Sequence, residues 1–388
     1  MAFSNHERQN RDLRTPVSPA PEPSLGSRQT LFDHAVSLHI KAPDSPLPGY
    51  GAPYPDEERH RRRAPKRPRD YALVGADAAQ VLREHFANPV ASPDDLVDAF
   101  HDIDVPIHRN EHIIAAARAT DPIRVRRTGR WLVRRSPDRC SAIIGLALVG
   151  VAGTVEDIPL IQTIGLLSDQ FAPLAAWALE RQDNGSMALL WLADRVAGWG
   201  RVYVVEALCR LADPAARDWL LRRPVDGDFL NGYFASAVAE VSGVHEAIVD
   251  PSVDDDLVDH AGRLLCVLAD GQGMLDKSVE DYPHAAGVLG AHVRHLGRQE
   301  PTAGRFATAA MLAAYLSGQA VPRQLHGLRD AYMAVLDRDD WCAVARRAVR
   351  DGDEYLHPDY LQWLAKVGSR LGLRAFTASR RTDETRSS

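Results

Sequence analysis

From Tyr71 onward, apolar residues recur at spacings of three and four, and Gly, Pro, Asp or Asn interrupts them about every 10 to 15 residues. This spacing places apolar side chains on one face of a helix, and the interruptions are typical of helix ends. Ser92-Pro93, Asp121-Pro122 and Asp213-Pro214 each pair a capping residue with a proline suited to the first helical position. Because no segment alternates with period two between hairpin turns, we predict an all-α protein of short helices with almost no sheet.

An internal repeat organises part of this helical pattern. Small-residue pairs stand in register at Ala117-Arg118, Ala147-Leu148, Ala178-Leu179 and Ala207-Leu208, at spacings of 30, 31 and 29 residues. Thirteen residues beyond the last three alanines stand Leu160, Trp191 and Leu220. We therefore interpret the unit as one helix, a short polar turn and a second helix that packs back on the first.

Two short antiparallel helices every 30 or so residues, with Ala-Leu on the first and Asp-Pro at the turn, resemble HEAT-like repeats. The resemblance covers residues 115–225, and LVDHAGRLLCVLADG, AGRFATAAMLAAYL and DDWCAVARRAVRDG resemble degenerate units. GWGRVYVVEAL, ARDWLLRR and LNGYFASAVAEVSG also resemble a segment of HEAT-like bacterial proteins of unknown function. The resemblance implies a right-handed α-solenoid of antiparallel helix pairs whose concave groove binds partners, and it implies no activity.

The two ends of the chain differ from this pattern. Residues 1–70 hold 11 of the 25 prolines and end in the basic run EERHRRRAPKRPRD. Long helices and strand ladders are disfavoured at that proline density. We therefore predict a disordered Pro/Arg-rich arm over 1–70, a HEAT-like domain over 71–376 and a disordered polar tail over 377–388. The basic run is either a solvated tail or a tether to an acidic protein, nucleic acid or anionic lipid.

Arginine is concentrated in the segment IRVRRTGRWLVRRSPDR, where seven arginines accompany a single Asp138. On a helix, Arg127, Arg130 and Arg134 share one face. This face is either solvated or a docking stripe for an acidic partner, because guanidinium groups grip carboxylates and phosphates in a bidentate manner. We assign Arg124, Arg127, Arg130 and Arg134 to partner binding.

A second candidate surface is marked by tryptophan. Trp199, Arg201, Asp218 and Trp219 lie close in sequence, and Trp and Arg dominate interface hot spots. Trp199 packed on the next helix, with Arg201 paired to Asp218, would explain the same residues without a ligand. We assign these four residues to partner binding as well.

Composition narrows the function classes. Lysine and arginine total 46 and acidic residues 52, for a net charge of -6, which disfavours wholesale nucleic-acid coating. The 42 arginines against four lysines are typical of a GC-rich bacterial genome. The four cysteines lack metal or redox spacing, the first ten residues lack an apolar signal, and the longest uncharged runs, of 17 and 16 residues, are too short to span a membrane. We expect a cytoplasmic protein with no membrane span, no metal and no cofactor.

Patterns of catalytic chemistry are weak. His108-Arg109-Asn110-Glu111-His112 formally matches the H-x-x-E-H zinc motif, but the sequence shows no sign of the mixed α/β fold that this motif requires. HEAT-like di-iron hydroxylases repeat His-Glu pairs, of which this chain has two. HEAT-like alkylpurine DNA glycosylases use aromatic and acidic residues on a basic face, and Trp199, Arg201, Glu206, Asp218 and Trp219 supply the residue types. Beyond Asp70, however, 34 basic residues stand against 43 acidic ones.

These observations favour a non-enzymatic protein-protein interaction scaffold or adaptor with an acidic partner. The alternatives are an enzyme, nucleic-acid-acting or otherwise, with its site in the groove near Trp199, and an immunity or antitoxin-type protein. The orientation of Trp199, Arg201, Glu206 and Asp218 discriminates the first two classes, since an enzyme requires them to converge on an open cleft.

Overall fold

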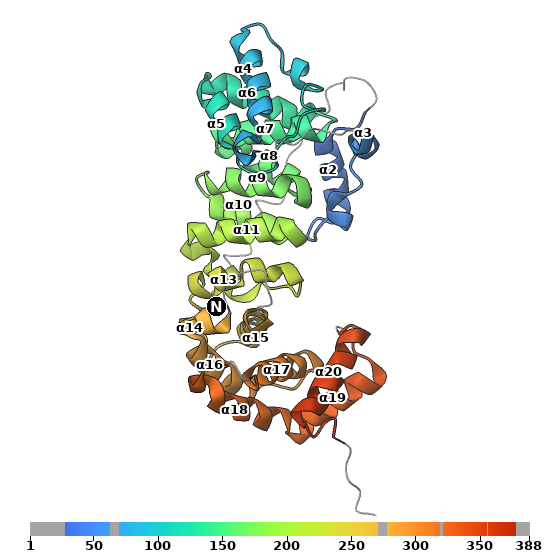
Figure 1. Cartoon of the computed structure of the whole chain (residues 1–388), viewed down its shortest axis with the longest axis vertical. Coiled ribbons are helices and arrows are strands. Elements are labelled where there is room, and N and C mark those ends of the chain that lie inside the picture. Colours follow the sequence, from blue (N-terminus) through green and yellow to red (C-terminus); the bar gives the residue numbers. More distant parts are fainter. Residues whose placement is uncertain (1–27, 63–69, 271–277, 319–320, 355, 378–388) are drawn as a thin grey trace, which may run out of the picture. The chain divides into compact units, whose positions relative to one another are not determined.

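A computed structural model describes residues 28–62, 70–270, 278–318, 321–354 and 356–377. All regular structure in these residues is helical, which confirms the all-α prediction. The chain divides into two compact units, Met1–Leu211 and Ala212–Ser388, coloured blue to green and yellow to red in Figure 1. Within the same residues, no helix combines the length and apolar character needed to cross a bilayer.

Unit 1 contains ten α-helices and four 3-10 turns in its described part. They are α2 (Leu31–Lys41), η1 (Pro48–Gly51), α3 (Glu57–Arg62), η2 (Tyr71–Leu73), α4 (Ala76–Ala87), η3 (Pro93–Leu96), α5 (Glu111–Arg118), α6 (Pro122–Arg135), α7 (Arg139–Ala152), η4 (Val155–Asp157), α8 (Ile158–Gly165), α9 (Ser168–Glu180), α10 (Gly185–Ala193) and α11 (Gly198–Leu211).

The helices of unit 1 pack in two series. Helices α5, α7, α9 and α11 contact one another in order, and α6, α8 and α10 do the same. Figure 1 shows α9, α10 and α11 side by side in green. The repeated alanines Ala117, Ala147, Ala178 and Ala207 all lie on the first series and are buried. The spacing of about 30 residues therefore marks equivalent buried positions on successive helices.

The predicted start signals of helices are confirmed. Asp121 accepts a hydrogen bond from the amide of Arg124 and precedes Pro122, the first residue of α6. Ser92 caps η3 and Asp213 caps η5, each followed by proline. These residues satisfy amide groups that have no partner within the helix.

The prediction of a disordered arm over residues 1–70 is wrong for residues 28–62. Thr30 caps α2, Leu31 and Ala35 of that helix are buried, and α2 packs on α6 and α8. No proline occurs between Pro23 and Pro43, so the local sequence allows a helix there. Residues 1–27 and 63–69 lie outside the described residues, as do residues 378–388 of the predicted tail.

The proline-rich residues 43–57, here called the strap, run along the N-terminal ends of three helices of the first series, α7, α9 and α11. Asp56 accepts the amide of Arg139 at the start of α7, with 2.8 Å between nitrogen and oxygen. Gly51 packs against Leu167, which precedes α9, and Tyr50 packs against Gly198, which begins α11. The prolines limit regular structure in the strap to the short turn η1 and the first residue of α3, and contacts with helix ends hold the rest in place.

Unit 2 contains nine α-helices and four 3-10 turns in its described part. They are η5 (Pro214–Ala216), α12 (Arg217–Arg222), η6 (Phe229–Tyr233), α13 (Ala235–Val241), α14 (Val244–Ala247), α15 (Asp255–Asp270), η7 (Val279–Asp281), α16 (Ala285–Leu296), α17 (Ala303–Leu316), η8 (Arg323–Leu325), α18 (His326–Leu336), α19 (Asp339–Asp351) and α20 (Pro358–Leu371). Helix α17 is central, because it contacts α15, α18, α19 and α20 (Figure 1).

Candidate functional site

Two of the four arginines assigned to the stripe have structural partners. Arg124 donates from Nη1 to the carbonyl of Phe86, at 2.8 Å, and its guanidinium also bonds the carbonyls of His85 and Asn88 at the end of α4. Arg130 binds Asp157, with 3.1 Å between Nη2 and Oδ2, and also reaches Glu156. These contacts engage both guanidinium groups within unit 1, and the assignment of Arg124 and Arg130 to partner binding stays a prediction.

Arg127 and Arg134 remain available on α6. Both are exposed, and neither forms an ion pair or hydrogen bond with another described side chain. Helix α6 buries its opposite face, through Val125, Leu132 and Val133, which leaves these two arginines toward solvent. The docking stripe is therefore reduced to two arginines separated by two turns of one helix.

Trp199 lies at the start of α11 and is 39% exposed. Its ring stacks on Tyr203, with 6.0 Å between centroids and 27° between planes. The His108 ring meets the edge of Tyr203 at 5.2 Å, although 95 residues separate them in sequence. The fold thus assembles an accessible aromatic surface from α11 and the loop before α5, which we call the Trp199 surface.

A carboxylate extends the Trp199 surface along α11. Glu206 follows Trp199 and Tyr203 at spacings of seven and three residues, so the three side chains share one face of the helix. Burial raises the pKa of Glu206, while Arg210, 3.9 Å away, lowers it. Partial burial lowers the pKa of His108, which favours its neutral form.

Arg201, Asp218 and Trp219 do not extend this surface. Arg201 is only 8% exposed and donates from Nη1 to the carbonyl of Ala193, at 3.0 Å, which ties α11 to the end of α10. Asp218 lies on α12 in unit 2, where it pairs with Arg222, and Trp219 is half-buried on the same helix. Arg201 is thus engaged with α10, and Asp218 and Trp219 lie in a different unit from Trp199. The assignment of these residues to partner binding stays a prediction.

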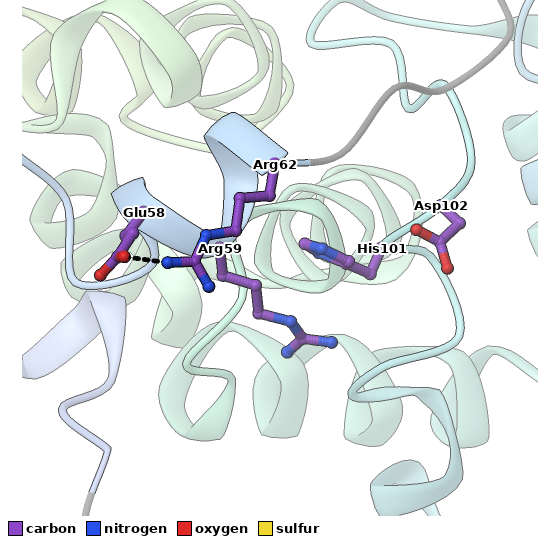
Figure 2. A pocket seen from close by; sticks show the side chains of 5 residues that line it. All are labelled: Glu58, Arg59, Arg62, His101 and Asp102. Carbon is purple, nitrogen blue, oxygen red and sulfur yellow. Dashed lines mark hydrogen bonds and ion pairs between the residues drawn. The ribbon is translucent and has the colours of Figure 1, made fainter.

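A small polar pocket of about 320 Å³ in unit 1 carries many charges (Figure 2). Glu58, Arg59 and Arg62 of α3 line it together with His101 and Asp102 of a loop, and Arg62 extends toward Glu58. Arg59 pairs with Asp98 at 2.7 Å, Arg62 pairs with Glu58, and His101 Nδ1 lies 2.6 Å from Asp138. These charges neutralise one another within the protein, so the pocket presents little unsatisfied charge to a ligand.

Cys140, at the start of α7, lies near the ring of His60, and a cysteine beside a histidine is the arrangement that a cysteine nucleophile needs. Its Sγ lies 4.0 Å from His60 Nδ1, but the cysteine is only 1% exposed. The amides of Arg139 and Cys140 donate to Asp56 and Asp138, so they are not free to stabilise an oxyanion. This arrangement does not support acyl transfer.

The H-x-x-E-H motif does not assemble a metal site. His112 Nε2 lies 2.7 Å from the carbonyl of Ala72, whereas His108 contacts Tyr203. Across the ranges that the structure describes, no group of three His, Cys, Asp or Glu side chains is placed to hold a metal ion.

A groove of about 1320 Å³ lies within unit 2. Its floor is α17, where Ala303, Gly304, Ala307, Thr308 and Met311 face the groove. Helix α15 and η6 line one side of α17, and α19 and the start of α20 line the other. The walls carry apolar and aromatic side chains, among them Phe229, Val267, Val344 and Tyr360.

Two cations line the groove without a carboxylate partner. Arg263 of α15 and Arg347 of α19 form no ion pair with any described residue, whereas Arg305 of α17 binds Asp259 with 2.8 Å between Nε and Oδ1. The pKa of Arg263 is lowered by burial, an effect that nearby Asp259 and Asp256 oppose. The Arg263 side chain is exposed at the rim of the groove, close to these two aspartates.

Sequence reasoning missed this groove. The sequence pattern predicts only degenerate repeat units in LVDHAGRLLCVLADG and DDWCAVARRAVRDG, although each segment places arginine beside apolar positions. The spacing of Asp259, Arg263 and Cys266 predicts that they share one face of a helix. It does not predict which helix packs against that face.

No family model, no curated protein and no solved structure matches this chain. The HEAT-like resemblance and the bacterial origin therefore stay predictions.

Proposed function

We propose that this protein is a non-enzymatic protein-protein interaction scaffold. The observation that carries the proposal is the Trp199 surface, where an accessible tryptophan stacks on Tyr203 at the start of α11. Large aromatic side chains supply much of the binding energy at protein interfaces, because they bury a wide area at low conformational cost. An accessible stacked pair is already ordered, so binding would restrict little further motion.

Helix packing supports a scaffold architecture of the predicted kind. The first helices of successive pairs contact one another in unit 1, and so do the second helices. This arrangement favours a right-handed α-solenoid of HEAT-like pairs, in which each repeat contacts its neighbours. All four cysteines are free thiols, which favours a reducing compartment such as the cytoplasm.

Arg127 and Arg134 support an acidic partner. Both are exposed, and no described residue forms an ion pair with either, whereas Arg124 and Arg130 of the same helix are engaged. Guanidinium groups bind carboxylates with two parallel hydrogen bonds, so an acidic segment is the natural ligand for this face.

Glu206 favours a second candidate, an enzyme at the Trp199 surface. A half-buried carboxyl group with a raised pKa beside aromatic rings is a pattern found in catalytic sites. Against it, Arg201 is buried and Asp218 belongs to unit 2. Nucleic-acid chemistry such as that of alkylpurine DNA glycosylases is further disfavoured by the excess of acidic residues. No observation bears on an immunity or antitoxin role, which stays a prediction.

The test is photo-crosslinking from the Trp199 surface. A photoreactive phenylalanine analogue replaces Trp199 in the full chain, and a matched variant carries it at Met187, which is 41% exposed on α10. The crosslinked protein is identified by mass spectrometry, purified and titrated against wild type, Trp199→Ala and Met187→Ala. We expect a partner crosslinked from position 199 only, with affinity reduced about tenfold by Trp199→Ala.

Two results would contradict the scaffold. One is that no protein crosslinks from position 199 beyond the background seen at position 187. The other is that the crosslinked protein binds Trp199→Ala as tightly as wild type. Loss of a hydrolytic or glycosylase activity in Glu206→Gln, with binding unchanged, would instead support the enzyme.

A further inference from the structure

We propose that the Trp199 surface binds an arginine side chain of the partner protein, whose guanidinium bonds Glu206 and lies against the rings of Trp199 and Tyr203. This inference rests on the proposed scaffold function, since it names a contact that the partner makes. The acidic residues proposed to meet Arg127 and Arg134 would contact α6, whereas the arginine would contact α11.

The carboxylates of this surface outnumber its cations. Arg210 binds Glu180 of α9 with two hydrogen bonds, from Nε to Oε1 at 3.0 Å and from Nη2 to Oε2 at 2.9 Å. The same guanidinium reaches Glu206 only at 3.9 Å, and no other described cation forms an ion pair with Glu206. One guanidinium is therefore shared by two carboxylates, and a second guanidinium would balance the charge.

The burial of Glu206 makes that missing charge matter. Its side chain is 36% exposed, so water solvates only part of the carboxylate, and this burial raises its pKa. A cation that bonds the carboxylate would stabilise the ionised form in place of the lost water. A guanidinium suits this position, because it forms two parallel hydrogen bonds with a carboxylate and is more weakly hydrated than an ammonium group.

The aromatic rings stand next to that carboxylate. Tyr203 lies one turn before Glu206 on α11, and side chains three residues apart on a helix are neighbours. Trp199 lies one turn further back, stacks on Tyr203 and is 39% exposed. A planar guanidinium lies against such rings while its N–H groups bond a carboxylate beside them. The stem of the arginine would then cover part of the accessible tryptophan.

The same combination of ring, carboxylate and guanidinium occurs twice inside unit 1. Arg139 lies over the ring of Tyr54, 4.6 Å from its centroid, and binds Asp56 at 2.8 Å. Arg195 lies over the ring of Trp191, 4.5 Å from its centroid, and binds a carboxylate of the strap at 2.9 Å. On the Trp199 surface the rings and the carboxylate come from one helix, and we assign the arginine to the partner.

The experiment selects short random peptides from a displayed library on the full chain, after removal of those that bind Glu206→Gln. Selected peptides are synthesised, labelled and titrated by fluorescence anisotropy. We expect enrichment of an arginine whose replacement by citrulline, which keeps the shape without the charge, weakens binding about tenfold or more. Replacement of that arginine by lysine should weaken binding about threefold or more.

Matched variants separate the contact from folding. Glu206→Gln keeps the shape of the side chain and should weaken binding about tenfold, whereas Glu84→Gln changes an exposed glutamate on α4 and should leave binding unchanged. Trp199→Phe, which keeps a ring, should bind more tightly than Trp199→Leu, which keeps only apolar volume. A peptide with glutamate at the arginine position should prefer Glu206→Lys to wild type, which a loss of structure would not produce.

Three outcomes would overturn the proposal: no arginine is enriched, Glu206→Gln binds the peptides as tightly as wild type, or citrulline or lysine replaces the arginine without loss. The scaffold would still stand if a protein crosslinks from position 199. Absence of any crosslinked protein, with arginine peptides bound at Glu206, would contradict the scaffold and support the arginine site. Glu206→Gln that loses an enzymatic activity and keeps its ligand would overturn the arginine contact.

Discussion

The guanidinium of Arg139 and the carboxylate of Asp56 meet at 2.8 Å, although 83 residues separate them in sequence. Both side chains are buried, at 6% and 2% exposure, and the same carboxylate accepts the amide of Arg139 at the start of α7. Arg139 also lies over the ring of Tyr54, with 4.6 Å to the centroid. This single pair therefore joins the strap to the first series of helices.

Removing the Asp56 carboxylate should destabilise unit 1. Asp56→Ala leaves a buried guanidinium and one amide without their main partner, so we expect a loss of about 3 kcal/mol in the free energy of unfolding. Glu57 also binds Arg139 but is 34% exposed, so Glu57→Ala should lose about 1 kcal/mol or less. Urea unfolding of both variants measures the difference, and equal losses would show that the strap is not held by the buried pair.

The arginines of α6 should separate into two classes. Arg124→Ala removes hydrogen bonds to the end of α4, and we expect it to lose about 1 to 2 kcal/mol of stability. Arg127→Glu with Arg134→Glu changes exposed, unpaired groups and should stay within about 0.5 kcal/mol of wild type. Thermal unfolding compares them. A strong loss in the double variant would mean that these two arginines also have structural partners.

Gly145 should not tolerate a side chain. A Cβ at this position of α7 would lie 2.6 Å from the Cβ of Leu132 and 2.9 Å from the backbone nitrogen of Val133, both on α6. Because helix backbone cannot shift easily, Gly145→Ala should cost about 1 to 3 kcal/mol.

Gly287→Ala is the matched control for this substitution. Gly287 lies within α16, and no neighbouring atom comes within 4 Å of the position that an alanine methyl group would occupy there. Alanine should therefore stabilise the helix by about 0.5 to 1 kcal/mol. Denaturant unfolding measures both variants. If both substitutions change the free energy of unfolding in the same direction, helix propensity rather than the contact between α6 and α7 decides the result.

His292 should make stability depend on pH. Burial lowers its pKa from 6.5 to about 4 in the folded state, and its Nδ1 lies 2.8 Å from the hydroxyl of Tyr332. Between these two pKa values the unfolded chain binds more protons than the folded one, so stability rises with pH. The contribution is fully present above pH 6.5 and is lost as pH falls toward 4.

At neutral pH this contribution is about 3 kcal/mol at most. His292→Asn keeps a hydrogen-bonding group beside Tyr332 and does not titrate, so it should flatten the dependence of the unfolding free energy on pH across that window. Urea unfolding at several pH values tests the difference in slope between wild type and variant. Parallel curves would refute the role of His292.

Local features of this protein were predictable from sequence because they depend on near neighbours. Apolar spacing of three and four predicted the helices, and Asp121-Pro122 marked the start of α6 as observed. The spacing of Ala147, Ala178 and Ala207 predicted a helical repeat, and these alanines are buried on α7, α9 and α11. Each signal lies within one or two turns of a helix, or repeats one such signal along the chain.

Tertiary packing alone decided which of the candidate residues are available for binding. Arg130 and Arg134 occur in the same local pattern on α6. Arg130 binds Asp157 of η4, which follows the next helix, whereas Arg134 forms no ion pair with a described residue. Arg263 and Arg347 line the same groove of unit 2, although they stand 84 positions apart in the sequence. Helical periodicity determines the face on which a side chain stands, whereas the packing of distant helices determines what that face meets.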